Sequence, residues 1–177
     1  MKKLSLEQLN RISAEEFRES DKMPIVLVLD DIRSLHNIGA AFRTADAFRI
    51  SKIYLCGITA SPPHREIHKT ALGATESVDW EYAENIEDVL KKLKSAGYAI
   101  YGIEQTNSSI LLNDLSYESN EIALIIGNEV HGVSDKALAY CDLAIEIPQA
   151  GTKHSLNVSV CTGIVLWHFF SRWKSIL

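Results

Sequence analysis

The chain has 177 residues, of which 46% are hydrophobic and 23% charged, a composition typical of a globular protein rather than a disordered or fibrous one. Its three cysteines are far apart and form no CxxC pair, which argues against a disulfide framework and a cysteine-rich zinc site. The N-terminal segment is too polar for a signal peptide, and no apolar run reaches membrane-spanning length. We therefore expect a cytoplasmic protein with no membrane partner.

The net charge of −5 at pH 7 is unevenly distributed along the chain. Residues 33–69 contain six Lys and Arg residues and two acids, together with three of the six histidines, whereas residues 76–142 contain thirteen acids and four lysines. A local basic region of this kind is what a phosphate-binding face needs. Ordinary scatter of surface charge explains the pattern equally well, so the charge alone does not decide between the two.

Five short apolar segments have the length and composition of buried strands. They are almost continuously hydrophobic and rich in β-branched or aromatic residues, which is typical of strands covered on both faces. The segments are Ile25–Asp30, Lys52–Gly57, Ala99–Glu104, Ile122–Gly127 and Leu143–Pro148, with Val78–Tyr82 as a weaker candidate for an edge strand.

Helical patterns lie between these strands. They cover Ile38–Phe48, Ile86–Ala96, Asp135–Tyr140 and a long, strongly apolar segment from about Ser155 to Trp173, and Gly97 is a helix stop signal. The alternation predicts an α/β fold with a mainly parallel sheet flanked by helices. Because no repeat, low-complexity tract or linker interrupts it, we expect a single domain over residues 1–177.

Two segments outside this alternation have signals of their own. Ser5–Arg11 and Ser13–Ser20 each begin with a capping-box pattern, which predicts a short helical arm over about residues 1–23. Thr59–Ser77 contains two adjacent prolines and several cationic residues, and it is the least regular part of the chain. We expect it to be a long functional loop.

Three segments that follow predicted strands hold unusual polar residues, and open α/β sheets bind their ligands at such positions. In the first, Asp30–Phe48, Asn37 and Gly39 stand at a helix start and Arg43 lies further along, among small residues. The simpler interpretation is that Asn37 is the helix N-cap and Arg43 a solvated helix residue.

The second segment, Ile125–Ser134, places Glu129 between two glycines directly after a buried strand. Its spacing is neither GxGxxG nor that of a P-loop, so dinucleotide binding has no support. An ordinary turn, with Ser134 capping the next helix, is the alternative.

The third segment runs from Ile147 to Phe170, where Ser155 and Asn157 open a very apolar helix. Ser155 is also a candidate for the N-cap of that helix. A helix this hydrophobic is expected to be buried against the sheet or against a second subunit, and its aromatic C-terminal end fits either place.

Other residue constellations do not support a metal site or a hydrolase. His64 and His68 are four residues apart but have no further ligands nearby, and no GxSxG nucleophile elbow occurs. Cys56, Cys141 and Cys161 adjoin apolar segments and are expected to be small buried hydrophobic residues.

Taken together and in this order, the three segments resemble the SpoU/TrmH family of RNA ribose 2′-O-methyltransferases, within the SPOUT superfamily. The matching stretches are NIGAAFRTADAF with Asn37 and Arg43, IIGNEVHGVS with Glu129, IPQAGTKHSLNVSV with Ser155 and Asn157, and the short KTALGA. The resemblance extends from Ile25 to about Trp167. Gln149 departs from it, because the family often has Met at this position beside the cofactor loop.

The resemblance implies a C-terminal trefoil knot that binds S-adenosylmethionine in a bent conformation, within a homodimer. Composition and periodicity do not indicate a knot, which is a rare exception to normal chain topology. By the same analogy, the expected cofactor contacts are Gly127, Asn128, Ile147, Gly151 and Leu156.

The implied reaction is methyl transfer to a ribose 2′-hydroxyl of structured RNA. The expected catalytic set is Arg43, Asn37, Glu129, Ser155 and Asn157. Because a guanidinium is almost never neutral in a protein, we expect Arg43 to bind an RNA phosphate and to stabilise the developing alkoxide. The other four residues are expected to hold Arg43, the ribose and the cofactor loops in register.

The implied partners are RNA and a second copy of the chain. Arg33, His36, Arg65 and Lys69 are the expected RNA contacts, and the knot region with the C-terminal helix is the expected dimer seam, across which one subunit presents RNA to the other's cofactor. A compact chain with only a short N-terminal arm is similar to enzymes that act on tRNA, but rRNA stays open. The alternative is a non-catalytic, knotted RNA-binding or assembly factor, against which the joint presence of all five catalytic-set residues argues.

Overall fold

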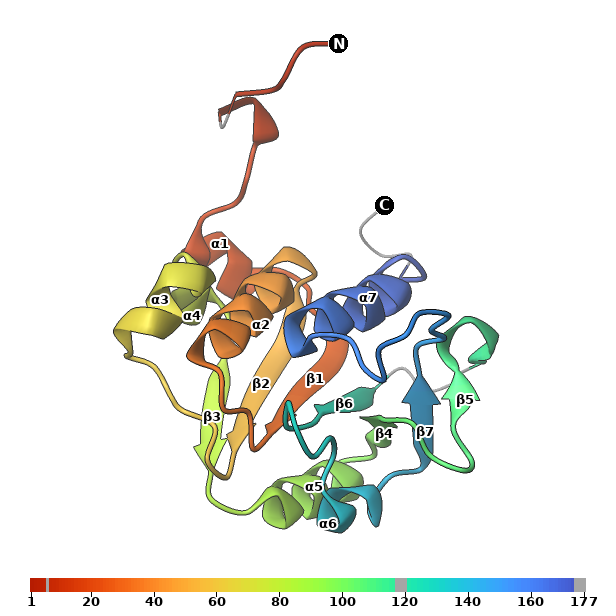
Figure 1. The fold of residues 1–177 in the computed structure, drawn as a ribbon. Coiled ribbons are helices and arrows are strands. Elements are labelled where there is room, and N and C mark those ends of the chain that lie inside the picture. The colour runs from red at the N-terminus through yellow and green to blue at the C-terminus, as the bar shows by residue number, and fades with distance from the viewer. Residues whose placement is uncertain (6, 117–120, 174–177) are drawn as a thin grey trace.

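A computed structural model describes residues 1–5, 7–116 and 121–173 and contains a seven-stranded sheet in the order β3-β2-β1-β6-β4-β7-β5 (Figure 1). All neighbouring strands pair in parallel. The strands are β1 (Met23–Asp30), β2 (Ile50–Cys56), β3 (Trp80–Ala83), β4 (Ala99–Ile103), β5 (Ile110–Leu111), β6 (Ile122–Ile126) and β7 (Leu143–Glu146). The predicted α/β class is confirmed, and Val78–Tyr82 corresponds to the edge strand β3.

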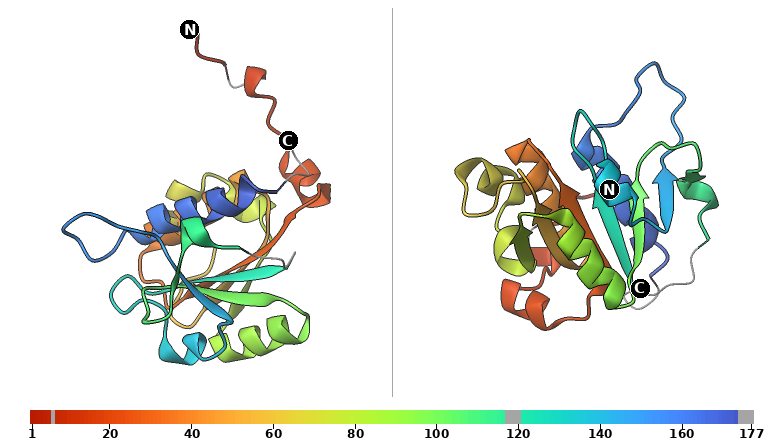
Figure 2. Two further views of the ribbon diagram at one scale, coloured as in Figure 1. Left: turned by 90° about the vertical axis from the view of Figure 1, so that its right-hand side faces the viewer. Right: turned by 90° about the horizontal axis from the view of Figure 1, so that it is seen from below.

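Helices cover both faces of the sheet (Figures 1 and 2). On one face lie α1 (Ala14–Glu19), α2 (Leu35–Ala47), α3 (Arg65–Ala71), α4 (Ala74–Ser77) and α7 (Val158–Phe170). On the other face lie α5 (Ile86–Ser95) and α6 (Asp135–Leu138). Two short 3₁₀ helices, η1 (Glu7–Leu9) and η2 (Leu112–Asp114), complete the described elements.

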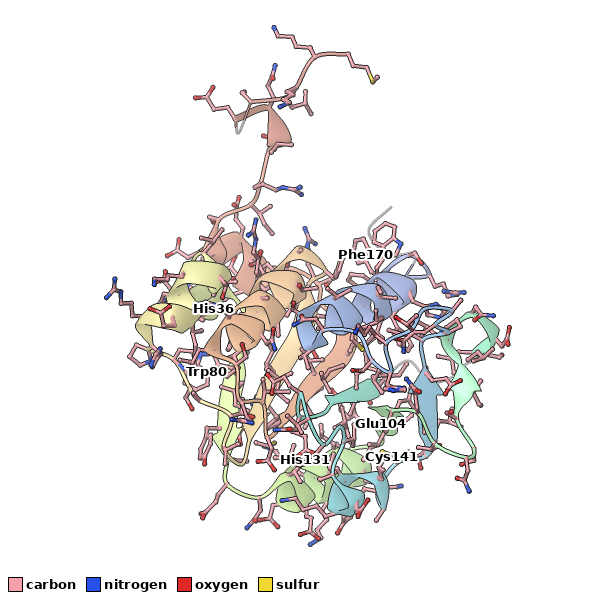
Figure 3. All side chains as sticks on the ribbon, in the orientation of Figure 1. His36, Trp80, Glu104, His131, Cys141 and Phe170 are labelled. Atoms are coloured by element: carbon pink, nitrogen blue, oxygen red, sulfur yellow. The ribbon has the colours of Figure 1, made fainter. Side chains whose placement is uncertain are left out.

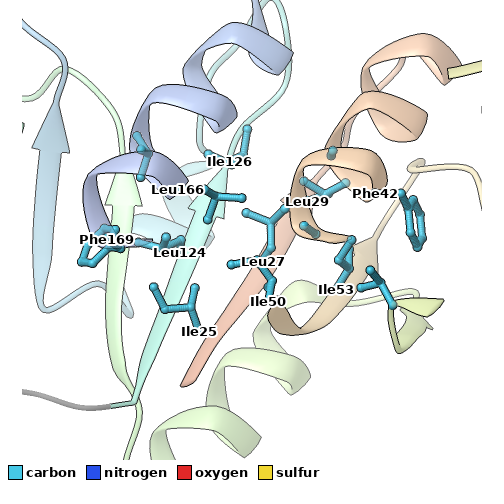
Figure 4. Close-up of a cluster of buried hydrophobic side chains, with 14 of the residues drawn as sticks. Ile25, Leu27, Leu29, Phe42, Ile50, Ile53, Leu124, Ile126, Leu166 and Phe169 are labelled. Carbon is cyan, nitrogen blue, oxygen red and sulfur yellow. The ribbon is translucent and has the colours of Figure 1, made fainter. Parts of the chain in front are cut away.

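The central strands are buried on both faces, as their continuous hydrophobicity predicts. Along β1, Leu27 and Leu29 point into the core beneath α2 and α7, while Val26 and Val28 point into the core above α5 and α6. The larger core is completed by side chains from β2, β6, α2 and α7 (Figure 4). This rigid double-sided core supports the loops at the carboxyl ends of the strands.

The segment Thr59–Ser77 is not the long irregular loop that its composition predicts, because it contains α3 and α4. Ile67 and Ala71 of α3 are buried, and a Cβ on Gly39 of α2 would lie only 2.1 Å from Thr70 Oγ1. The close approach of the two helices stabilises α3, and this tertiary contact leaves no local signal in the sequence.

Helix starts also differ from the prediction. Ser34, and not Asn37, is the N-cap of α2, since its side chain accepts a hydrogen bond from the Asn37 backbone N–H. Asn157, and not Ser155, caps α7, which therefore begins at Val158. In both cases the predicted cap is an asparagine or serine two or three residues from the true one, and it is an equally good local signal.

The N-terminal region is only partly as expected. Ser13 and Glu16 form the predicted capping box of α1, and Ser5 and Gln8 exchange the corresponding two hydrogen bonds. Among the described residues 5 and 7–11, however, the helical structure is limited to the three-residue η1. The two-residue strand β5 has no signal in the sequence. Gly97 directly follows Ala96, the C-cap of α5, and has a φ of 91°, so it is the predicted helix stop signal.

Candidate active site

A cavity of about 330 Å³ lies at the carboxyl ends of β4, β6 and β7, where parallel sheets usually bind ligands. Its walls come from the residues after β4, the turn 127–133 after β6, and the loop 147–157 that connects β7 to α7. Of the expected cofactor contacts, Gly127, Asn128, Ile147 and Leu156 line this cavity, and Gly151 does not. Glu129 and Ser155 of the expected catalytic set line it as well.

The turn 127–133 is closely packed upon itself. Asn128 and Gly132 exchange two backbone hydrogen bonds of 2.9 Å each, and a Cβ on Gly127 would lie 2.1 Å from the Gly132 carbonyl carbon. The Asn128 side chain donates to the Asp31 carbonyl oxygen at 2.6 Å and accepts from the N–H of Val130 at 2.9 Å. Since its side chain is occupied in this way, Asn128 shapes the turn that lines the cavity.

Glu129 joins this turn to the start of α2. Its carboxylate accepts hydrogen bonds from the backbone N–H groups of Arg33 and Ser34, both at 3.0 Å, and from Asn37 Nδ2 at 2.9 Å. Burial raises the pKa of Glu129, but the hydrogen bonds from Arg33, Asn37 and Ser34 outweigh burial and hold the pKa below its usual value. The carboxylate is therefore ionised and also complements the positive end of the α2 dipole.

Asn37 extends the same network to α7. It is 7% exposed, and its Oδ1 lies 3.4 Å from Asn157 Nδ2. Asn157 Oδ1 in turn accepts from the Ser159 backbone N–H at 2.9 Å. Three residues of the expected catalytic set, from three distant segments, are thus brought together beside the cavity.

Arg43 lies away from this network. Its side chain is exposed and lines a second groove, of about 790 Å³, formed with Asp46 and Phe48 of the α2 end, the α3–α4 junction and residues 10–14. Within the described residues it makes no hydrogen bond or ion pair. One copy of the chain therefore does not bring Arg43 to its own cavity.

Three of the four expected RNA contacts converge on one carboxylate at the surface. Glu66 Oε2 lies 3.3 Å from His36 Nε2, Glu66 Oε1 lies 2.8 Å from Lys69 Nζ, and Arg65 Nε is 4.0 Å away. Hydrogen bonds from Lys69 and His36 lower the pKa of Glu66. We call His36, Arg65 and Lys69 the basic patch (His36 is labelled in Figure 3). Arg33 is exposed on the β1–α2 connection, next to the Glu129 network.

Three other expectations concern histidines, cysteines and membranes. His64 is the N-cap of α3, and the described residues include no group of three or more His, Cys, Asp or Glu side chains able to hold a metal ion. Of the three cysteines expected to be buried, Cys56 is buried, whereas Cys141 and Cys161 are half-buried. Burial raises the pKa of Cys56 to about 12 and the pKa of Cys141 and Cys161 to about 11. In residues 1–5, 7–116 and 121–173, no helix has both the length and the hydrophobicity to span a membrane.

Glu104 and Gln105 line the cavity but are not among the residues selected from the sequence. Glu104 accepts a hydrogen bond from the Val133 backbone N–H at 2.8 Å, and Gln105 Nε2 donates to the His154 carbonyl oxygen at 2.9 Å. Their one signal in the sequence is a pair of polar residues at the carboxyl end of a buried strand.

The parallel sheet, together with the cavity between the loops that follow β4, β6 and β7, defines an α/β protein with a ligand site at the carboxyl ends of the strands. The model of the SpoU rRNA Methylase family matches residues 24–167, and the chain belongs to this family. The resemblance of the three segments is thereby confirmed, whereas the trefoil knot stays a prediction.

Curated relatives include two enzymes named 23S rRNA (guanosine-2′-O-)-methyltransferase RlmB. The enzyme from Neisseria meningitidis is 33% identical over 158 residues, covering 89% of this chain and 62% of the relative. The enzyme from Nitrosomonas europaea is 34% identical over 148 residues, covering 84% of this chain and 56% of the relative. The chain thus spans about three-fifths of the length of these relatives.

Solved structures show the same fold. An AdoMet-bound rRNA methyltransferase from Sinorhizobium meliloti superposes with a TM-score of 0.81 at 28% identity, covering 90% of this chain and 61% of that one. A TrmH/SpoU tRNA modifying enzyme from A. aeolicus superposes with a TM-score of 0.79 at 26% identity, covering 90% of this chain and 81% of that one.

Proposed function

We propose that this chain transfers the methyl group of S-adenosylmethionine to a ribose 2′-hydroxyl of RNA. The observation that carries the proposal is the convergence of Asn37, Glu129 and Asn157, three family-motif residues, beside a cavity at the carboxyl edge of the sheet. The names of the relatives support the reaction class, since they include a 23S rRNA (guanosine-2′-O-)-methyltransferase and a TrmH/SpoU tRNA modifying enzyme.

The cavity suits this cofactor chemically. Ile103, Ile126, Ile145 and Leu156 supply apolar surface for an adenine ring, and the backbone of the turn 127–133 and of the loop 147–157 supplies hydrogen-bonding groups. Carboxylates of Glu104, Glu129 and Glu146 at its wall favour a cationic ligand over an anionic one. When bound, the cofactor supplies an electrophilic methyl group on a sulfonium centre.

The residues of this chain contribute mainly by positioning. Glu129 fixes the turn 127–133 to the first turn of α2, and Asn157 fixes the start of α7 to the same point through Asn37. In-line attack by the 2′-oxygen requires the donor and the ribose to be held at near-attack distance, so the rigidity of this junction favours the reaction. We assign to Arg43 the binding of an RNA phosphate and the electrostatic stabilisation of the alkoxide.

A homodimer explains why Arg43 lies away from the cavity of its own chain. Val160, Ile164 and Trp167 of α7 are 50%, 38% and 57% exposed, and their spacing places them on one face of the helix. This apolar face adjoins the end of α2, since the ring centroid of Trp167 lies 5.9 Å from that of Phe48, the C-cap of α2. An isologous contact through α7 is our proposed seam, across which Arg43 of one subunit completes the cavity of the other.

The basic patch and Arg33 are the proposed RNA contacts. They lie on α2, α3 and the β1–α2 connection. Exposed cations of this kind contact phosphates and supply affinity that depends on salt. A ribose is common to rRNA and tRNA, and both are candidate substrates.

The test is methyl transfer in vitro. Purified protein is incubated with methyl-labelled S-adenosylmethionine and with tRNA or rRNA lacking modification, and the product is digested with alkali. Incorporated label in alkali-resistant dinucleotides supports ribose 2′-O-methylation. Label found on the bases would show that the methyl acceptor is not the ribose. Cofactor binding with no transfer to any RNA would favour a non-catalytic RNA-binding factor.

A further inference from the structure

We propose that the consecutive residues Glu104 and Gln105 are positioning residues, each of which holds one of the two loops of the cofactor cavity. Glu104 holds the turn 127–133, and Gln105 holds the loop 147–157. The proposal rests on the proposed function, because it assigns the two loops a common ligand.

Glu104 is anchored on three sides. Its backbone N–H donates to the Ile145 carbonyl oxygen at 3.0 Å, which continues the pairing of β4 with β7. Its Oε1 accepts from the Gln105 N–H and its Oε2 from the Val133 N–H, both at 2.8 Å. The carboxylate therefore bridges the end of β4 and the end of the turn 127–133 (Glu104 and His131 of this turn are labelled in Figure 3).

Gly132 gives independent support for this role of Glu104. Gly132 has a φ of 68°, and a Cβ at this position would lie 2.0 Å from Glu104 Oε2. A side chain at residue 132 would thus be strained and would also displace the carboxylate. The turn and the Glu104 side chain fit each other only because residue 132 is a glycine.

Gln105 has the corresponding role for the other loop. Among the described residues, the bond from Gln105 Nε2 to the His154 carbonyl oxygen is the only hydrogen bond that joins residues 147–156 to the rest of the chain. Residues 148–156 are exposed, so few packing contacts replace this bond if it is lost. The segment includes Ile147, Ser155 and Leu156, which line the cavity.

Because Glu104 and Gln105 are neighbours, the end of β4 fixes the separation of the two loops. A ligand that contacts both loops binds more tightly when neither has to be ordered on binding. Neither side chain needs to touch the ligand for this effect, since both Glu104 oxygens and the Gln105 Nε2 already form hydrogen bonds within the protein.

The test combines hydrogen exchange of the ligand-free protein with the binding of S-adenosylhomocysteine measured by calorimetry. We expect Glu104→Gln to accelerate amide exchange in residues 127–133 and Gln105→Met to accelerate it in residues 147–157. Each substitution leaves the other loop unchanged. Each is expected to weaken S-adenosylhomocysteine binding about tenfold, while RNA affinity changes less than twofold.

Glu146→Gln is the matched control. Glu146 lines the same cavity, but its carboxylate accepts from Ser109 Oγ and holds neither loop. The substitution removes the same charge from the cavity wall and is expected to leave exchange in both loops unchanged. Equal weakening of binding by Glu146→Gln and Glu104→Gln would show that charge, and not loop position, is responsible.

Unchanged exchange in both loops of the two variants would overturn the proposal. If Glu104→Gln fails to fold, the exposed residue Gln105 still allows the test, because Gln105→Met must accelerate exchange in residues 147–157. If the unsubstituted protein does not bind S-adenosylhomocysteine, the proposed function fails. The role of the two residues in holding the loops is still tested in that case by exchange of the ligand-free protein.

Discussion

Asn37 Oδ1 and Asn157 Nδ2 lie 3.4 Å apart although 120 residues separate them in the sequence. The contact joins the first turn of α2 to the N-cap of α7, and Glu129 joins the same asparagine to the turn after β6. A single buried amide thus connects the three segments that identify the family.

This arrangement makes the orientation of the Asn37 amide essential. In Asn37→Asp, a carboxylate replaces the Nδ2 donor and faces the Glu129 carboxylate, so two like charges share one site. We expect the free energy of unfolding to fall by about 1–3 kcal/mol at pH 7 and methyl transfer to be lost. Urea unfolding and single-turnover kinetics check both results, and Asn107→Asp, at an exposed position that lines neither the cavity nor the Arg43 groove, is the control.

The Glu129 carboxylate should give stability a specific pH dependence. Its pKa is lower in the folded chain than in the unfolded one, so its stabilising effect is complete above the unfolded pKa and is lost as pH falls through the folded pKa. Glu129→Gln is therefore expected to be less stable than the unsubstituted chain at pH 7, by about 1–2 kcal/mol, with the difference shrinking below about pH 4. A difference that stays constant between pH 7 and pH 3 would contradict this role.

Complementation between two inactive variants tests the composite site. Arg43→Ala is expected to abolish methyl transfer with little change in S-adenosylhomocysteine affinity, and Leu156→Arg is expected to block the cavity. If Arg43 acts on the partner's cavity, a mixed dimer contains one intact site, so mixing the variants under conditions of subunit exchange restores activity. If a mixture shown to contain mixed dimers recovers no methyl transfer, Arg43 does not act on the cavity of the partner.

The exposed apolar face of α7 predicts the oligomeric state. Val160→Lys places a charge at a position that is 50% exposed in one copy of the chain but is buried in the proposed seam. We expect sedimentation to show a dimer for the unsubstituted protein and a monomer for the variant, because an unpaired buried charge is costly. Tyr82→Lys, at a 47% exposed position on the edge strand β3, should remain dimeric.

Charge changes in the basic patch should alter RNA binding in opposite directions. Lys69→Glu is expected to weaken RNA binding. Because about one phosphate contact is lost, the slope of log K against log salt concentration should become shallower by roughly 0.7–0.9. Glu66→Gln removes the carboxylate on which His36 and Lys69 converge, so it should strengthen binding at low salt. Filter binding at several salt concentrations measures both, and an unchanged slope for Lys69→Glu would show that this residue faces away from the RNA.

The sequence by itself determined the class of fold and the family stretches in which the candidate site residues stand. Continuous apolar runs such as Ile122–Ile126 have the length and β-branched content of strands covered on both faces, and Asn37, Glu129 and Asn157 stand in recognisable family stretches. These features are local, since hydrophobic periodicity and short motifs are read within a few residues.

Only the tertiary structure decided which of these residues meet and which do not. The contact of Asn37 with Asn157, the distance of Arg43 from the cavity, and the use of Glu104 and Gln105 to hold two loops all depend on segments far apart in the chain. The helices within Thr59–Ser77 likewise form because α3 packs against Gly39 of α2. The physical reason is the same in each case: the stabilising partner lies on another element, so its contribution exists only once the chain has folded.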